Sequence, residues 1–134
     1  MSRQYLGLDI GTKRIGVAVA DDVVKIAVPL ETLEMDESTI RASIARLVTQ
    51  HDIETIVLGY PRNQSGEATK QTEYVEKIAG LLKDIDAAIV FQDESLSSVT
   101  AEHRLASRTK QYSKADIDAE AAAIILQDYL EIHL

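Results

Sequence analysis

The stretch QYLGLDIGTKRIGVAVA at residues 4–20 contains two apolar runs on either side of a short glycine-containing turn. Residues 4–10 and residues 14–20 each have the length and composition of a short strand, and the turn between them is tight. Strands joined this closely pair antiparallel. We therefore expect the sheet of this protein to begin as a hairpin.

One acidic residue, Asp9, lies near the end of the first expected strand. Side chains alternate along a strand, so Asp9 shares a face with Tyr5 and Gly7, opposite the leucines. We expect Gly7 to leave open space beside Asp9, and Gly11 to let the backbone turn closely around whatever Asp9 binds. The alternative is a strand-end aspartate that caps the turn.

Beyond this hairpin, apolar runs alternate with helical patterns. A third strand is expected over residues 24–30, ending near Pro29. The other expected elements are a helix at 38–51, a strand at 55–58, a helix at 67–84, a strand at 87–92, and helices at 96–107 and 115–132. This order predicts an α/β fold with a mixed five-stranded sheet, antiparallel first and then parallel, flanked by helices. Residues 1–134 are expected to form a single domain.

The composition excludes several classes of protein. Cysteine is absent, which excludes disulfides and thiolate metal sites and fits a cytoplasmic location. We see no signal peptide and no apolar run that could span a bilayer, so no membrane partner is expected. The net charge of −8 argues against a non-specific DNA coat protein, because binding to phosphates relies on Lys and Arg. A nuclease is compatible with this charge, since metal ions supply positive charge at the reacting phosphate.

A second acidic position of interest follows the expected strand at 87–92. Glu94 comes just after the carboxyl end of this strand, which is the edge of an open α/β sheet where ligands gather. The adjacent Asp93 is an alternative ligand, because two consecutive acids point in different directions. Asp93 also has a purely structural interpretation, since it immediately precedes a helix.

The third acidic position is at the start of the last expected helix. Ser113 and Asp116 have the spacing of a capping box, which accounts for Asp116. Capping does not account for Asp118, which instead begins the apolar stripe of the helix. The other members of the expected stripe are Ala122, Ile125, Tyr129 and Ile132. A carboxylate that faces a core is costly unless a cation compensates it, so Asp118 is expected to meet one.

Four motifs in order resemble the YqgF (RuvX) type of RNase H-like nuclease, across nearly the whole chain. They are LDIGTKRIGVA at 8–18, GYPRNQSG at 59–66, DESLSSVTA at 93–101 and KADIDAEAAAIILQ at 114–127. The resemblance implies an RNase H-like fold with Asp9, Glu94 and Asp118 as catalytic and metal-binding acids. It also implies hydrolysis of phosphodiester bonds assisted by Mg²⁺ or Mn²⁺, which fits oxygen ligands without His or Cys. In a two-metal arrangement the ions lie about 3.5–4 Å apart.

The same resemblance implies a nucleic-acid substrate. The family is associated with trimming the 5′ end of pre-16S ribosomal RNA, and so with ribosomal precursor particles, and an older proposal is resolution of Holliday junctions in branched DNA. A junction resolvase favours a homodimer, whereas an RNA-trimming enzyme can act as a monomer. The residues expected to bind substrate are Lys13, Arg14, Arg62, Asn63, Arg104 and Lys114.

The chain departs from the family pattern at one position. Ser95 stands where the family has arginine, and serine cannot contact a phosphate bidentately. Arg104 or Arg108, further along the next expected helix, is a candidate substitute.

Two other classes of function stay open. The run DIGT also resembles a phosphate-binding motif of actin-like ATPases, which would make the chain a nucleotide-binding domain. The change at Ser95, together with the acidic charge, would alternatively suit a non-catalytic RNA-binding module.

Overall fold

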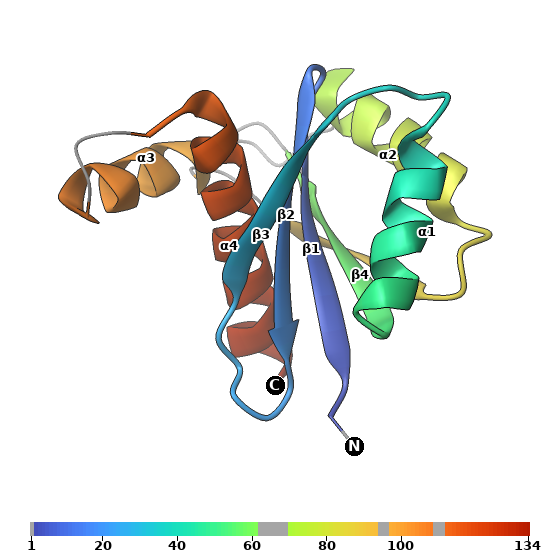
Figure 1. The fold of residues 1–134 in the computed structure, drawn as a ribbon, viewed down its shortest axis with the longest axis horizontal. Coiled ribbons are helices and arrows are strands. Elements are labelled where there is room, and N and C mark those ends of the chain that lie inside the picture. The colour runs from blue at the N-terminus through green and yellow to red at the C-terminus, as the bar shows by residue number, and fades with distance from the viewer. Residues whose placement is uncertain (1, 62–69, 94–96, 109–111) are drawn as a thin grey trace.

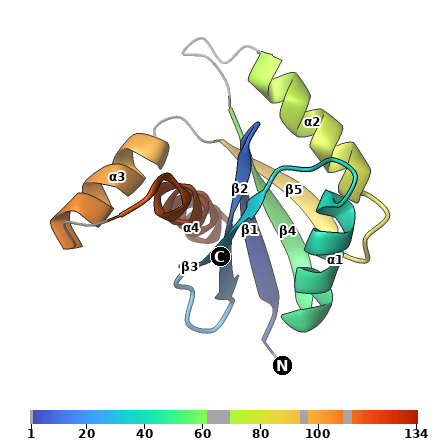
Figure 2. The same ribbon diagram turned by 45° about the horizontal axis from the view of Figure 1, so that its top comes forward.

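The computed structural model describes residues 2–61, 70–93, 97–108 and 112–134. A five-stranded sheet forms the middle layer, with α1 and α2 on one face and α4, with α3 beside it, on the other (Figures 1 and 2). The elements are β1 (Gln4–Ile10), β2 (Arg14–Asp21), β3 (Val28–Glu34), α1 (Ile40–Gln50), β4 (Ile53–Tyr60), α2 (Lys70–Leu82), β5 (Ala88–Asp93), α3 (Ser97–Arg108) and α4 (Lys114–His133).

The strand order β3-β2-β1-β4-β5 confirms the expected mixed sheet. β1 and β2 pair antiparallel, β2 and β3 pair antiparallel, and β4 pairs parallel with both β1 and β5. The carboxyl ends of β1, β4 and β5 therefore lie at one edge of the sheet. We call this edge, together with the β1–β2 turn and the first two turns of α4, the catalytic pole, because the predicted acids Asp9 and Asp118 lie on these elements.

The expected third strand at 24–30 was wrong in its position. The carboxylate of Asp21 accepts hydrogen bonds from the backbone N–H groups of Val23 and Val24, which bends the chain into a turn before the strand begins. Lys25 continues this turn with a φ of 61°. Pro29 lies inside β3 rather than at its end, which the sheet tolerates because β3 is an edge strand.

Two glycines let α4 lie directly on the sheet. A Cβ on Gly7 would lie 2.7 Å from the Cβ of Leu126, and a Cβ on Gly16 would lie 1.9 Å from the carbonyl oxygen of Asp118. The expectation of open space at Gly7 was therefore wrong, because α4 fills that space. Gly7 and Gly16 mark the places where the backbone of α4 approaches the strands most tightly.

The start of α4 agrees with its expected cap, and its apolar stripe agrees in part. The Ser113 side chain accepts from the N–H of Asp116, and the Asp116 carboxylate accepts from the N–H of Ser113, so the capping box is complete. Ala122 and Ile125 are buried, but Ile132 is 66% exposed. In the described part of the chain, no helix combines the length and the apolar character needed to cross a membrane.

Replacing Gly16 by alanine is expected to lower the free energy of unfolding by about 3 kcal/mol or more, because the added methyl group would overlap the backbone of Asp118. Gly80 in α2 is the matched control, since a Cβ there meets nothing within 4 Å. Gly80→Ala should stabilise the protein by about 0.5–1 kcal/mol. Urea unfolding followed by circular dichroism measures both changes. Equal stability of the two variants would show that the contact between α4 and β2 is not tight.

Candidate active site

Asp9 and Asp118 are brought together by the pairing of β1 with β2. Asp9 lies directly opposite Gly16 in the antiparallel ladder, so both residues face the same side of the sheet. This is the side of α4, because the space above Gly16 is occupied by the backbone of Asp118. The two acids are 109 positions apart in sequence, and the structure places the backbone of Asp118 over Gly16, the residue that lies opposite Asp9.

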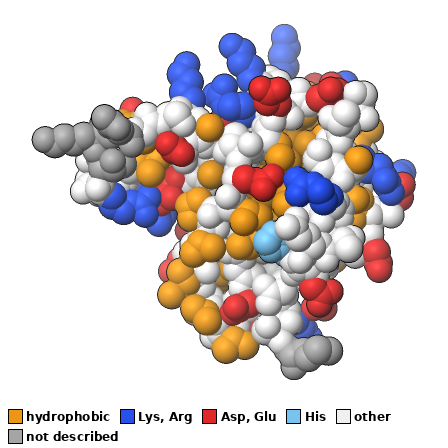
Figure 3. Space-filling model, in the orientation of Figure 1, with side chains coloured by type: hydrophobic (Ala, Val, Ile, Leu, Met, Phe, Trp, Pro, Cys, Tyr) orange, Lys and Arg blue, Asp and Glu red, His pale blue; other side chains and the backbone are white. Residues whose placement is uncertain are grey.

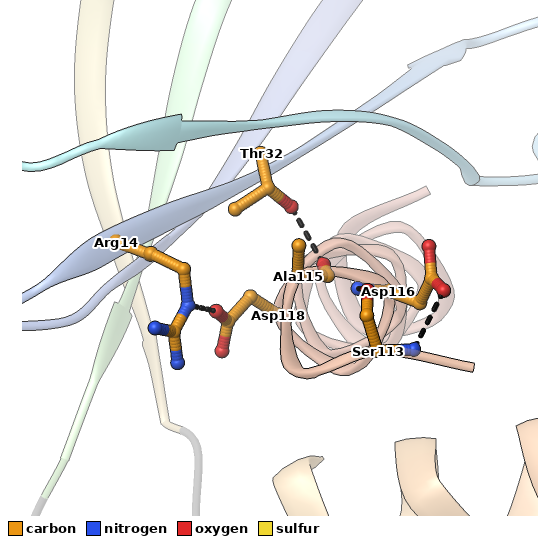
Figure 4. Close-up of polar contacts among 6 residues, drawn as sticks. All are labelled: Arg14, Thr32, Ser113, Ala115, Asp116 and Asp118. Atoms are coloured by element: carbon orange, nitrogen blue, oxygen red, sulfur yellow. Dashed lines mark hydrogen bonds and ion pairs between the residues drawn. The ribbon is translucent and has the colours of Figure 1, made fainter.

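Asp118 meets the cation that its place in the helix predicted. The Nε of Arg14 donates a hydrogen bond of 2.6 Å to Oδ2 of Asp118 (Figure 4). The side chains are 34% and 21% exposed, so the ion pair is only partly screened by water. Arg14 was expected to bind substrate, and the structure adds a contact with a predicted metal ligand.

Further contacts fix the helix that carries Asp118. The Thr32 hydroxyl donates a 2.7 Å hydrogen bond to the carbonyl oxygen of Ala115, which ties the first turn of α4 to β3 (Figure 4). The capping box between Ser113 and Asp116 closes the end of the same turn. Asp118 therefore projects from a helix end that is held at two points, which suits a ligand that must keep its position.

Asp93, one of the two candidate acids near the carboxyl end of β5, is the last residue of that strand. Along β5, Val90 packs on the side of α4, whereas Ile89 packs in the core under α1 and α2. Alternation then places Asp93 on the side away from Asp9. This favours Glu94 over Asp93 as the third ligand, but Glu94 itself lies outside the described residues, as do Arg62, Asn63 and Ser95.

Arg104, which is expected to bind substrate, pairs in the structure with a buried carboxylate. Its Nε lies 3.0 Å from Oε1 of Glu120, and a terminal nitrogen of Arg108 lies 2.9 Å from the same oxygen. These distances make ion pairs, although the angles are not those of hydrogen bonds. Glu120 is 1% exposed, so the two arginines join α3 to a buried carboxylate of α4. Sequence reasoning missed Glu120, although an acid surrounded by Ala119 and Ala121–Ala123 was a visible signal.

Basic side chains gather at the catalytic pole. Lys13, in the β1–β2 turn, and Lys114, the first residue of α4, are both exposed. Figure 3 shows Lys and Arg side chains grouped at the top of the molecule, where these elements end. The Gln71 amide donates to the carbonyl oxygen of Ile10, which places the start of α2 beside the end of β1.

A separate cavity of about 1050 Å³ lies at the amino ends of the strands, with Gln4, Asp52, Glu54 and Asp86 among its lining residues. None of the predicted site residues lines it. Ligands of open α/β sheets bind at the carboxyl ends of the strands. This favours the catalytic pole over the cavity as the place of the predicted chemistry.

The acids of the catalytic pole suit a hard divalent cation. Carboxylate oxygens without His or Cys are the ligands of Mg²⁺ and Mn²⁺ rather than of zinc. Within the described ranges no cluster of three possible ligands occurs, and Glu94 lies outside these ranges. Asp9 and Asp118 provide two of the three predicted carboxylates.

Replacing Glu120 by alanine is expected to loosen α3 from α4, because Arg104 and Arg108 lose their shared anion. The cost should be about 1–3 kcal/mol, moderated by the partial exposure of both arginines. Hydrogen exchange of α3 amides and urea unfolding measure it, with Glu131→Gln on the exposed side of α4 as control. If Arg104→Gln leaves α3 exchange unchanged and only weakens binding of nucleic acid, Arg104 is a substrate contact after all.

Comparisons with known proteins place this site in a family. The sequence profile of the RuvX family, described as Holliday junction resolvase, matches residues 3–132. A protein of Sulfurihydrogenibium sp. (strain YO3AOP1) is 41% identical over 98% of this chain and 91% of the relative. One of Geobacillus sp. (strain WCH70) is 36% identical over 96% of this chain and 97% of the relative. Both relatives are named as pre-16S rRNA nucleases.

Solved structures support the fold. The RuvC protein of T. thermophilus, in complex with a Holliday junction substrate, superposes with a TM-score of 0.61 over 97% of this chain and 94% of that chain, at 14% identity. At this identity the likeness concerns the fold alone, and it agrees with the RNase H-like fold that the motifs implied. The chain, matched from residue 3 to residue 132, is a member of the RuvX family.

Proposed function

We propose that this protein is a metal-dependent nuclease that hydrolyses phosphodiester bonds, with Asp9, Glu94 and Asp118 as its catalytic and metal-binding acids. The observation that carries the proposal is that Asp9 lies opposite Gly16, over which the backbone of Asp118 packs. Neighbouring carboxylates repel each other unless cations lie nearby. Arg14 is one such cation, and a bound metal would be the other.

Mg²⁺ or Mn²⁺ bound by these acids would supply Lewis acidity and a more acidic water. The residues of the chain supply position and charge. Asp9 is held by the centre of the sheet and Asp118 by the capped end of α4, so both present oxygens from rigid elements. Lys13, Arg14 and Lys114 are the proposed contacts with the phosphates of the substrate, and the sequence adds Arg62 and Asn63 to this set.

The substrate that we propose is RNA at the 5′ end of pre-16S ribosomal RNA, within ribosomal precursor particles. The names of the relatives support this choice. Aromatic residues make up only 4% of the chain, so recognition would depend on backbone and shape more than on stacked bases. A cytoplasmic location and action as a monomer fit this role.

The second candidate function is resolution of Holliday junctions by a homodimer, with the family description and the fold of the junction-bound RuvC protein in its favour. A resolvase must cut two strands related by a two-fold axis. The two functions therefore differ in substrate and in the number of copies at work.

Asp9→Asn and Asp118→Asn are each expected to lower cleavage at least about a hundredfold, since a neutral amide is a poor ligand for a hard cation. Labelled RNA that carries the pre-16S 5′ end and a four-way DNA junction are incubated separately with Mg²⁺, Mn²⁺ or EDTA. Asp84→Asn is the matched control. Asp84 also pairs with an arginine, but its side chain is exposed and it belongs to none of the elements that form the catalytic pole. RNA cleavage that persists in both site variants would refute the proposed acids.

Ser95→Arg restores the residue of the family pattern and should raise cleavage, because a guanidinium can bind a phosphate bidentately. We expect a lower KM with little change in kcat if the gain lies in binding. Ser95→Lys adds the same positive charge without the planar guanidinium, so comparing the two variants shows whether charge or bidentate geometry produces the gain. A decrease in cleavage with both variants would show that serine is suited to the substrate of this protein.

A further inference from the structure

Arg14 contacts Asp118 through one atom only. Its Nε donates to Oδ2, and among the described residues no other hydrogen bond of the Arg14 side chain occurs. Figure 4 shows one terminal nitrogen level with the second oxygen of Asp118 and the other on the far side of the guanidinium. The outer edge, or fork, of the planar guanidinium therefore faces away from Asp118 and can contact phosphate oxygens while Nε stays on Asp118.

Asp118 is also used through one oxygen. The described contacts engage Oδ2, so Oδ1 can serve as a ligand while Arg14 remains in place. Arginine cannot lose its proton in a protein, so its charge persists beside any cation that Asp118 binds. The side chains are only partly exposed, which limits screening between the two charges. Arg14 should therefore weaken metal binding in the free protein.

A phosphate changes this balance. When an anionic phosphate binds to the fork of Arg14, the guanidinium is neutralised and its repulsion of the metal falls. The same phosphate also attracts the metal directly. Linkage then requires that each ligand strengthen binding of the other by the same factor.

We propose that Arg14 is a positioning residue that couples binding of the divalent metal at Asp118 to binding of a substrate phosphate. It keeps the metal weakly bound in the free protein and strengthens the site when nucleic acid arrives. This inference rests on the proposed function in one respect, namely that Asp118 is a metal ligand. It assigns to Arg14 a role beyond that of a simple phosphate contact.

The first test measures binding of Mn²⁺ alone to the full chain, by calorimetry and by the electron paramagnetic resonance signal of free Mn²⁺. Arg14→Gln removes the charge and should tighten Mn²⁺ binding about tenfold. Arg14→Lys keeps the charge and should bind Mn²⁺ like the wild-type protein. Arg41→Gln is the matched control, because Arg41 makes the same kind of Nε contact with Asp84 on the surface. It should change nothing.

A purely structural role for Arg14 gives the opposite result. If Arg14 only held Asp118 in place, Arg14→Gln would weaken Mn²⁺ binding, and that result or an unchanged affinity overturns the proposal. Urea unfolding shows whether each variant is folded. If Arg14→Gln does not fold, the lysine variant decides the matter in the second test.

The second test repeats the Mn²⁺ titration with a short phosphorothioate RNA present. In the wild-type protein the RNA should tighten Mn²⁺ binding about tenfold, and in Arg14→Lys the effect should fall several-fold because lysine lacks the fork. Equal tightening in both proteins overturns the coupling. Neither titration depends on cleavage. If Arg14→Gln binds Mn²⁺ more tightly but the wild-type protein cleaves neither RNA nor DNA, the proposed function is refuted and the role of Arg14 is not. Failure of the wild-type chain and Arg14→Gln to bind Mn²⁺ would refute both.

Discussion

The close approach of α4 to the hairpin of β1 and β2 is the constraint on which the rest of the structure depends. Gly7 and Gly16 have no side chains, and the helix backbone occupies the space that side chains would fill. This contact sets the height of α4 above the sheet, and it places Asp118 beside Asp9. A fold of this type could bury its core with a helix farther from the strands. It could not then bring an acid of the helix to an acid of the sheet.

The acids at the start of α4 show how position decides the role of a carboxylate. Asp116 closes the capping box, Asp118 pairs with Arg14, and Glu120 binds the two arginines of α3. They lie within two turns of one helix but face in three directions. Of these three acids, Asp118 is the one that pairs with the β1–β2 hairpin, through Arg14 of β2. Glu120 is more buried than Asp118, yet it faces α3 and therefore has a structural part, in keeping with the rule that buried charges are paired.

The sequence was informative where the deciding interactions are local. The hairpin, the order of strands and helices, and the capping box follow from alternation, helical spacing and turn residues, and each is confirmed. The need of Asp118 for a cation also followed from its place in the stripe.

The sequence was less informative where elements far apart meet. Gly7 was interpreted as open space because the approach of α4 is not visible locally, and the pairing of Arg104 with Glu120 was missed because it depends on how α3 lies against α4. The start of β3 depended on hydrogen bonds of Asp21, which the pattern of apolar residues does not show.

The β1–β2 turn also bears on the choice between nuclease and nucleotide-binding domain. In a phosphate-binding turn, the backbone N–H groups must point at the ligand. Here the N–H of Gly11 donates to the carbonyl oxygen of Arg14 at 2.9 Å, so it is already used within the turn. A Cβ on Gly11 would lie 2.6 Å from that same oxygen, which makes the glycine a requirement of the turn itself. The DIGT motif therefore needs its glycine to close the hairpin that aligns Asp9 with Gly16. This local reason for the motif favours a site made of carboxylates, with phosphate contacts supplied by the side chains around them.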